Sequence, residues 1–378
     1  MHKQRYNTLT INGVTLKGDE LERFCHERTT EASLLSSKIK DWERDMYAFI
    51  LEWLDDSETV YAHTSGSTGV PKSICLKKKS MIASAKLTGE YLVLEEGQTA
   101  LLCLSTNYIA GKMMVVRAFV LGLNLIAVEP TGHPLNQLEQ HVDFAAMVPL
   151  QVFNCIDDRA RLEQINHLII GGGAVDNELL NKLREVSTCC YSTYGMTETV
   201  SHVALKKLNG ADKSDNYNGL GDVCFSTDDR GCLVIDALDI LEESLITNDV
   251  VELINDNEFK WLGRLDNVIN SGGIKLMPEQ LERKLTESGA GGTVEILQRL
   301  AETRFFFGGL PDAKLENKLV MVIEGEQWDM NSQRELQICM KQLLGKYEQP
   351  REILFVPSFA ETQTGKVQRV KSLKRGEE

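Results

Sequence analysis

The residues of this sequence that could do chemistry gather first in one stretch rich in glycine and hydroxyl groups. It consists of Thr64, Ser65, Gly66, Ser67, Thr68, Gly69, Val70, Pro71 and Lys72. Backbone N–H groups and hydroxyls in such a turn can surround a polyphosphate, and a lysine adds positive charge. The spacing differs from a Walker A loop, because a proline precedes Lys72. A polar surface loop has a similar composition, so the stretch alone favours phosphate binding only modestly.

A second candidate is a run of three glycines, Gly171, Gly172 and Gly173, which follows the apolar run 168–170. Without side chains, this backbone could accept a flat ring lying against it. A tight strand-to-helix turn would need the same residues, and the glycines alone do not separate these two interpretations.

Segment 194–199 is more specific, since it combines an aromatic ring, a hydroxyl and a carboxylate. It contains Tyr194, Gly195, Thr197 and Glu198. An aromatic face can stack on a base, and a carboxylate oxygen suits Mg²⁺. The Thr-Glu pair could also begin a helix by capping it.

Two further segments place charged residues beside turns. Asp249 ends the tripeptide 247–249, in which Asn248 tolerates a left-handed backbone almost as glycine does. Alone, an aspartate at a strand end is usually only a turn former. The longer segment 261–275 contains Arg264, Asp266 and a glycine pair that begins at Gly272.

The last candidate is Lys366, which ends the stretch 362–366, Thr-Gln-Thr-Gly-Lys. A lysine fixed on such a loop could bridge a carboxylate and a phosphate during reaction. The alternative is one more lysine in a basic tail.

Taken in this order, the segments resemble the motifs of the adenylate-forming superfamily, which contains acyl-CoA synthetases, luciferases and non-ribosomal adenylation domains. The resemblance covers residues 60 to 370. It implies ATP, Mg²⁺ and CoA as cofactor and co-substrates. It also implies that stretch 64–72 binds phosphate, that Tyr194 stacks on adenine, that Thr197 bonds the α-phosphate and that Glu198 holds the metal.

The same resemblance assigns the second half of the chain. Asp249 would grip the ribose hydroxyls, Arg264 would lie near ribose and phosphate, and Asp266 would be the hinge. Gly272 would belong to a turn that lines a pantetheine tunnel, and Lys366 would be catalytic. Two positions depart from the family pattern: Asn248 replaces glycine, and Ala360 replaces a proline near the lysine loop.

The implied reaction has two halves. A carboxylate attacks the α-phosphorus of ATP to give acyl-AMP and pyrophosphate, and CoA then takes the acyl group. An amino-acid adenylating enzyme is disfavoured, because no carrier-protein segment follows Lys366. A degenerate nucleotide-binding regulator would be expected to lose Lys366, Glu198 or Asp249, and all three are present.

Two features indicate which carboxylic acid is the substrate: the small number of residues before the glycine-rich stretch, and one apolar segment. Only 63 residues precede the glycine-rich stretch, which is similar to small o-succinylbenzoate–CoA ligases of menaquinone biosynthesis. In segment 104–117, Gly111 and Arg117 match that family, whereas Asn107 and its neighbour occupy the place of the usual histidine. Lys112 and Arg117 could bind the second carboxylate, or could be charges snorkelling from an amphipathic helix. A CoA ligase for another aromatic or medium-chain acid is the alternative.

The alternation of short apolar runs with helical stretches predicts the fold class, an α/β protein. Strands are expected at 59–62, 99–104, 124–128, 144–148, 166–170 and 188–191, mainly parallel, with helices near 79–93, 109–121 and 176–186. Residues 1–58 are expected to form a helical cover, and 218–262 a β-rich subdomain. The predicted domains are therefore 1–263, an AMP-binding body, and 264–378, a small mobile α+β domain.

Composition narrows the partners. The chain has 378 residues and a net charge of −14, which argues against a nucleic-acid binder. Nine scattered cysteines without zinc-ligand spacing indicate a reducing cytoplasm. The N-terminus has no signal-peptide pattern, and the most apolar stretch, 100–128, is broken by charges, so no membrane span is expected. A homo-oligomer is left open.

Overall fold

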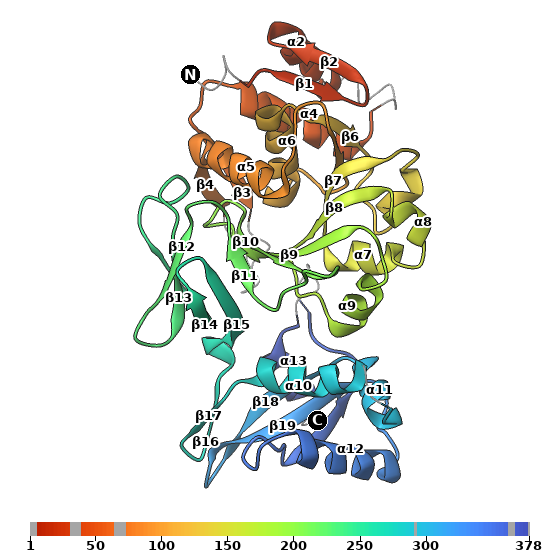
Figure 1. Cartoon of the computed structure of the whole chain (residues 1–378), viewed down its shortest axis with the longest axis vertical. Coiled ribbons are helices and arrows are strands. Elements are labelled where there is room, and N and C mark those ends of the chain that lie inside the picture. The colour runs from red at the N-terminus through yellow and green to blue at the C-terminus, as the bar shows by residue number, and fades with distance from the viewer. Residues whose placement is uncertain (1–5, 31–38, 64–72, 291–292, 362–366, 377–378) are drawn as a thin grey trace.

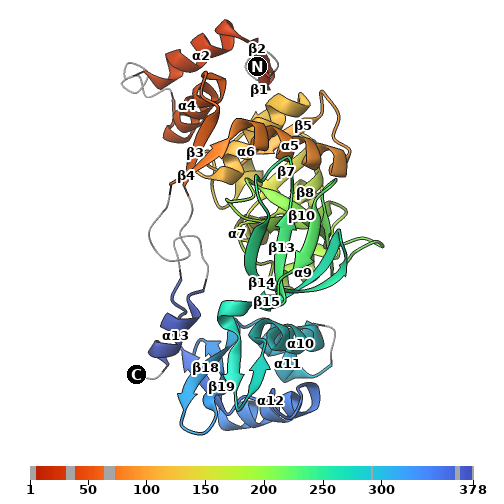
Figure 2. The same cartoon turned by 90° about the vertical axis from the view of Figure 1, so that its left-hand side faces the viewer.

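The computed structural model describes residues 6–30, 39–63, 73–290, 293–361 and 367–376. It shows the predicted α/β class, with a large layered body, a β-rich subdomain and a smaller α+β domain at the C-terminal end (Figure 1). The two views agree that this smaller domain lies at one end of the molecule (Figure 2).

The body is organised around one 13-stranded sheet, whose strand order is β12-β13-β14-β15-β11-β10-β9-β8-β7-β5-β6-β1-β2. Neighbouring strands run parallel from β9 to β1. Those strands are β9 (Cys189–Gly195), β8 (Ile165–Ile170), β7 (Val142–Met147), β5 (Thr99–Leu102), β6 (Asn124–Ala127) and β1 (Thr8–Ile11). Their nearly continuous apolar sequences are typical of strands covered on both faces.

Two hydrophobic clusters lie on the two faces of this sheet, and neighbouring residues of one strand alternate between them. Leu102, Phe144 and Ile169 join the first cluster, whereas Leu101, Ala145 and Leu168 join the second. The first cluster lies against α4 (Asp41–Leu54), α5 (Lys78–Leu92) and α6 (Ile109–Leu121). The second lies against α7 (Pro149–Cys155) and α9 (Asn177–Leu183), with α8 (Arg159–Leu162) and the 3₁₀ turn η1 (Pro134–Gln137) beside it.

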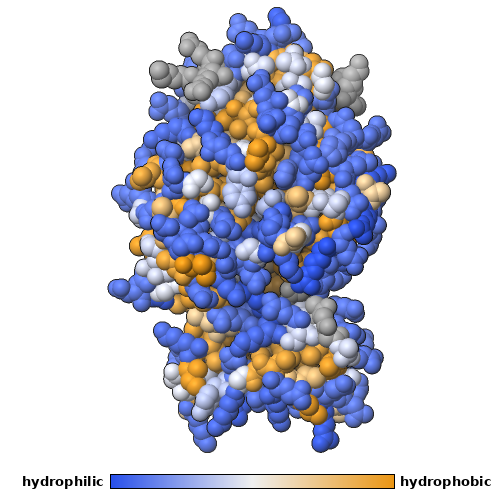
Figure 3. Space-filling view, viewed as in Figure 1, coloured by the Kyte–Doolittle hydropathy of each residue, from blue (hydrophilic) through white to orange (hydrophobic). Residues whose placement is uncertain are grey.

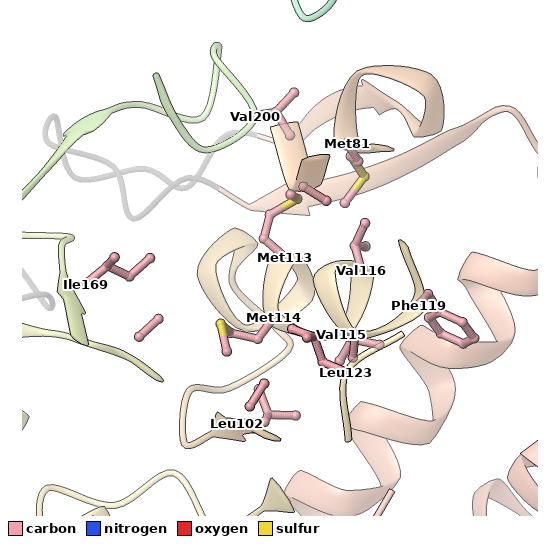
Figure 4. Packing of buried hydrophobic residues seen from close by; sticks show 14 of the residues in the cluster. Met81, Leu102, Met113, Met114, Val115, Val116, Phe119, Leu123, Ile169 and Val200 are labelled. Atoms are coloured by element: carbon pink, nitrogen blue, oxygen red, sulfur yellow. The ribbon is translucent and has the colours of Figure 1, made fainter. Parts of the chain in front are cut away.

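Helix α6 occupies the centre of the first cluster. Its residues 111–119 are all buried. Figure 4 shows Met113, Met114, Val115 and Val116 directed toward surrounding elements rather than toward one face. A helix that is apolar on all sides is typical of a core position, and the two charged residues inside it therefore need an explanation.

The N-terminal segment and the first predicted strand differ from expectation. The helical cover includes α2 (Asp19–Thr29) and α4, but β1 and β2 (Val14–Lys17) form a hairpin that extends the main sheet. Strand β3 (Thr59–His63) is not part of the parallel sheet. It pairs antiparallel with β4 (Ser73–Lys77) in a separate two-stranded sheet. The prediction that the glycine-rich stretch follows a parallel strand was wrong. Strand β3, which precedes the stretch, pairs with β4, the next apolar segment along the chain.

The antiparallel end of the main sheet forms the predicted β-rich subdomain. It contains β10 (His202–Lys207), β11 (Tyr217–Gly219), β12 (Cys224–Thr227), β13 (Cys232–Asp236), β14 (Leu245–Asn255) and β15 (Glu258–Arg264). Asn248 lies inside β14 and not in a turn, and its φ is not positive. The expected left-handed turn there was wrong.

The C-terminal part has its own core, whose members all lie at or beyond Ile269, whereas both body clusters end at or before Phe259. A 3₁₀ turn, η2 (Leu265–Asn267), connects the two parts. The strands are β16 (Ile269–Ser271), β17 (Ile274–Leu276), β18 (Phe305–Asp312), β19 (Glu316–Glu324) and β20 (Glu352–Val356). The helices are α10 (Pro278–Ala290), α11 (Glu295–Ala301), α12 (Met330–Leu343) and α13 (Arg369–Arg375).

Hydrophilic residues cover most of the face shown in Figure 3, with smaller apolar areas between them. Within the described part of the chain, no helix is both long and apolar enough to cross a membrane.

Candidate active site

The segment between β9 and β10 carries several predicted residues and is shaped by close backbone contacts. A Cβ at Gly195 would lie 2.4 Å from the carbonyl oxygen of Ser201, so only glycine fits. The hydroxyl of Thr199 accepts the Met196 N–H at 2.9 Å and lies 2.7 Å from the carbonyl of Ser201. Val200 has a left-handed φ of 66°. These constraints turn the chain directly into β10, so the alternative of a capped helix is excluded.

Two residues of this turn, Thr197 and Glu198, remain accessible. Thr197 is half-buried, and Glu198 is exposed. Because the turn is held by Thr199 and Gly195, both side chains are presented from a fixed backbone at the carboxyl end of a sheet strand. Ligands bind at such strand ends in open α/β sheets.

Asp249 is the most heavily bonded carboxylate near this turn. Its Oδ2 accepts the Tyr194 hydroxyl at 2.8 Å, and its Oδ1 accepts the Trp261 indole N–H at 3.1 Å. Arg264 Nη1 lies 3.6 Å from the same Oδ1. The register of β14 and β15, which pairs Asp249 with Arg264, creates this grouping. The structure therefore brings together three residues predicted separately: Tyr194, Asp249 and Arg264.

The Tyr194 ring is fixed by other aromatic rings. It meets Phe259 edge-on at 5.0 Å between centroids and lies 5.6 Å from Tyr217. Burial, followed by the charge of Asp249, raises the pKa of Tyr194. The hydroxyl therefore stays protonated as a donor, and the ring keeps a fixed orientation suited to stacking.

The three glycines follow β8 and approach the same sheet edge. A Cβ at Gly171 would lie 2.3 Å from Thr193 Oγ1, while Gly172 has a φ of 81°. Gly172 and Gly173 are exposed. No helix begins until Asn177, so the glycines form an open backbone edge beside strand β9, which carries Tyr194.

The predicted acid-binding residues are divided by the structure. Arg117 is fully buried, and its Nη2 donates to the Ser201 hydroxyl at 2.9 Å. Lys112 instead donates to Glu52 of α4 at 2.8 Å, and Asn107 donates to Asp45 of α4 at 2.7 Å. Lys112 and Arg117, which the sequence offers together for the second carboxylate, have different surroundings, because five residues along α6 place them on different sides of the helix.

Arg117 has an unusual environment. Its Nε donates to Thr88 Oγ1 at 3.3 Å, and its Nη1 lies 3.8 Å from Met114 Sδ. Burial lowers the pKa of Arg117 to about 9, so it still carries a charge at pH 7. Among the described residues, no carboxylate forms an ion pair with it. Such a buried, uncompensated charge is rare unless a ligand compensates it.

The predicted hinge and tunnel residues lie at the start of the C-terminal part. Asp266 accepts from Arg264 at 2.7 Å and from Asn248 at 3.3 Å. Gly272 and Gly273 both have positive φ, which a two-residue hairpin turn between β16 and β17 requires. Arg283 of α10 donates to the Trp261 carbonyl at 3.1 Å, which connects the two parts across the hinge.

The remaining predicted residues lie outside the described part of the chain. These are Thr64, Ser65, Gly66, Ser67, Thr68 and Lys72, which join β3 to β4, and Lys366, which precedes α13.

Comparison with known proteins identifies the family. A family model described as AMP-binding enzyme matches residues 26–228. A solved acyl-CoA synthetase (AMP-forming)/AMP-acid ligase II-like protein from Dyadobacter fermentans is 36% identical, with 91% of this chain and 98% of that chain covered and a TM-score of 0.59. The chain belongs to the AMP-binding enzyme family.

Other members of the AMP-binding family share the fold at lower identity. The 2-succinylbenzoate–CoA ligase of Escherichia coli (strain K12) is 25% identical over 78% of this chain, and the chain spans only 64% of its length. The solved o-succinylbenzoate CoA synthetase of Bacillus subtilis, in complex with its acyl-adenylate OSB-AMP, is 17% identical. The alignment covers 97% of this chain and 95% of the Bacillus subtilis chain, with a TM-score of 0.73, so the two proteins share a fold.

The sequence reasoning missed several residues that complete this site. Trp261 begins the predicted segment 261–275 but has no role assigned from the sequence, yet it donates to Asp249. Thr88, Ser201 and His202 were not singled out, although they surround Arg117. Only the position of Ser201 and His202, directly after the Thr-Glu turn, could have indicated them.

Proposed function

We propose that this protein joins a carboxylic acid to CoA through an acyl-AMP intermediate, and that the acid is a dicarboxylate, o-succinylbenzoate. Family membership and the names of the curated relatives support the reaction class. The choice of acid rests on one observation: Arg117 is a buried cation with no carboxylate partner among the described residues.

The position of Arg117 connects this cation to the nucleotide side of the site. Its partner Ser201 follows the turn that presents Thr197 and Glu198, and Tyr194 precedes that turn. A second carboxylate bound at Arg117 would therefore leave the rest of the acid near a nucleotide held by Tyr194 and Asp249. A charge-assisted, bidentate contact is the interaction that a guanidinium makes best with a carboxylate.

In the first half-reaction, one oxygen of the carboxylate to be activated attacks the α-phosphorus of ATP. The bond from that phosphorus to the bridging oxygen breaks, and pyrophosphate leaves. Tyr194 would stack on adenine, Asp249 and Arg264 would hold the ribose, and Thr197 would bond the α-phosphate. Stretch 64–72 and Lys366 would supply donors and positive charge, since positioning and charge stabilisation dominate phosphoryl chemistry.

Glu198 fits the requirements of a magnesium ligand. It is an exposed carboxylate on a rigid turn, and Mg²⁺ is usually bound by one or two carboxylates together with substrate phosphates. The described residues contain no cluster of three or more His, Cys, Asp or Glu side chains that could hold a metal without substrate. When bound, the ion would neutralise charge on the phosphate oxygens.

In the second half-reaction the thiol of CoA loses its proton and its sulfur attacks the acyl carbon, releasing AMP. We propose that residues 264–378 turn about Asp266 between the halves, as a unit separate from 1–263. In support, this part has its own core and is tied to the body near the hinge by the hydrogen bond that Asn248 donates to Asp266. Gly272 would then move toward the site with its hairpin. The cytoplasm is the proposed location, and all nine cysteines are free.

A panel of acids tests this proposal. Pyrophosphate release is measured with and without CoA for o-succinylbenzoate, for analogues that lack one carboxylate, and for other aromatic, medium-chain and amino acids. Preference for the dicarboxylate with formation of a thioester is the expected result. Preference for a monocarboxylate would assign the enzyme to another acid.

Two matched variants then test the site. Arg117→Met should lower kcat/KM for the dicarboxylate about ten- to a hundredfold, the usual effect of a lost charge-assisted contact, and should spare the analogue that lacks that carboxylate. Lys112→Met removes a cation from the same helix, but one paired with Glu52, and should not change the preference. Equal loss on both acids in Arg117→Met would contradict the proposed acid site.

A further inference from the structure

Four polar side chains form a closed hydrogen-bonded ring in the core. Arg117 Nε lies 3.3 Å from Thr88 Oγ1, which lies 3.2 Å from His202 Nε2. His202 Nδ1 lies 3.4 Å from Ser201 Oγ, and Ser201 Oγ accepts Arg117 Nη2 at 2.9 Å. Thr88 comes from α5 and Arg117 from α6, while His202 begins β10 and Ser201 directly precedes it. Arg117, His202 and Thr88 are buried.

Counting hydrogens fixes the direction of each bond. The single Thr88 hydroxyl hydrogen has the Ser84 carbonyl as an acceptor at 3.0 Å, so Thr88 can accept from both Arg117 and His202. His202 then carries its proton on Nε2, and its bare Nδ1 accepts the Ser201 hydroxyl. The other tautomer would leave the Ser201 hydrogen without an acceptor within the described residues. Only the first assignment gives a partner among the described residues to both hydroxyl hydrogens and to the imidazole hydrogen.

The ring holds the charge of Arg117 in one orientation. Its Nε hydrogen and one Nη2 hydrogen are engaged by hydroxyls, and the hydrogen-bond partner of Nη1 among the described residues is the Met114 sulfur. The Phe144 ring centroid lies 5.9 Å from the guanidinium carbon. The Nη1–Nη2 edge therefore has donors available for a carboxylate. Burial, followed by the charge of Arg117, lowers the pKa of His202 well below its usual range. His202 is a neutral spacer between two hydroxyls.

We infer that His202 and Thr88 are positioning residues that determine selectivity for a dicarboxylate, because they lock Arg117 with its Nη1–Nη2 edge toward the ligand. This inference rests on the proposed function of Arg117. Neither residue touches the reacting atoms. Each acts through the Arg117 guanidinium, because without these hydrogen bonds the Arg117 side chain would populate several rotamers.

Thr88→Val tests the inference with little change of shape. We expect the ratio of kcat/KM for the dicarboxylate over that for the matched monocarboxylate to fall about tenfold, mainly through KM, within the range of coupling inside one hydrogen-bond network. His202→Leu should have a similar effect, and Thr88→Ser should restore the ratio. Thr188→Val is the control, since Thr188 is also buried and donates to a backbone carbonyl, Leu162 O, at 2.8 Å.

A double-mutant cycle separates this inference from the proposed function. In an Arg117→Met background, Thr88→Val should change the ratio little further. If Arg117→Met itself leaves the ratio unchanged, the proposed acid site is wrong. If Arg117→Met lowers the ratio but Thr88→Val and His202→Leu match Thr188→Val, only the positioning role is overturned.

The wild-type protein gives a test that needs no stable variant. Long-range ¹H–¹⁵N spectra distinguish imidazole tautomers, and His202 should appear neutral with its proton on Nε2 at pH 6.5. A charged ring or a proton on Nδ1 would overturn the inference.

Discussion

Replacing Arg117 by methionine should make the protein more stable while making it a poorer enzyme for the dicarboxylate. The two effects have one cause. A guanidinium buried without a counter-ion among the described residues is unfavourable to folding, and the same charge is what a substrate carboxylate would meet. If Arg117 had a purely structural role, both properties would fall.

The expected gain can be bounded. Replacing buried charged groups with apolar residues of similar volume is often neutral or stabilising by about 1–4 kcal/mol. In this ring both hydroxyls keep another partner after the change, Ser84 O for Thr88 and His202 for Ser201. We therefore expect the free energy of unfolding to rise by about 1–2 kcal/mol. For a domain of this size, each kcal/mol raises Tm by about 2–4 °C.

The dicarboxylate should narrow this difference in stability, and should reverse the order when the variant binds the acid a hundredfold more weakly. At about 100 times its Kd it stabilises the wild type by about 2.7 kcal/mol. The variant, binding ten- to a hundredfold more weakly, would gain only about 0.4–1.4 kcal/mol at the same concentration. Scanning calorimetry of both proteins, with and without the acid, measures all four values. A variant several kcal/mol less stable without ligand, or one stabilised equally by the acid, would refute this reasoning.

Three further outcomes are expected. Lys366→Ala should reduce acyl-AMP formation by about 10²–10³ or more, yet leave thioester formation from supplied acyl-AMP largely intact; equal loss of both halves would contradict its role. Asp266→Pro should keep adenylation and lose thioester formation, because proline fixes the φ that a hinge must change; two normal activities would place the hinge elsewhere. Below about pH 6.5 the unfolded chain binds a proton at His202 and the folded chain, in which burial and Arg117 lower that pKa, does not. The wild type should therefore lose about 1.4 kcal/mol relative to His202→Leu between pH 7.5 and 5.5, as parallel denaturant titrations would show.

Much of the fold could be predicted because local patterns agree with it. The apolar runs at β5, β7 and β8 and the glycine pair at 272–273 behave as their sequences indicate. Strand β3 was misplaced because an apolar run does not reveal its partner. Strands β1 and β2 were missed, since two four-residue strands around a tight turn are too short to show a period among helix-forming residues.

The candidate site also combines features that local sequence predicts with features that depend on distant partners. Residues within one motif, such as Tyr194 and Gly195, could be identified from their spacing. Contacts between distant segments could not. Arg117 and Lys112 look equivalent in sequence, as two charges in an apolar helix, but their meaning depends on partners elsewhere in the chain. Glu52 compensates Lys112, whereas the hydrogen-bond partners of Arg117 among the described residues are neutral.

This contrast also explains how one fold could change its acid without changing its chemistry. The turn from Gly195 to Ser201, on the proposed nucleotide side, is fixed by backbone contacts. Its last residue, with His202, reaches into a core where α5 and α6 supply the other partners. Substitutions on those two helices can alter the charge and shape that meet the acid while the turn remains unchanged. Selectivity for the acid should therefore depend on residues of α5 and α6, and adenylation on residues of the turn and of β14 and β15.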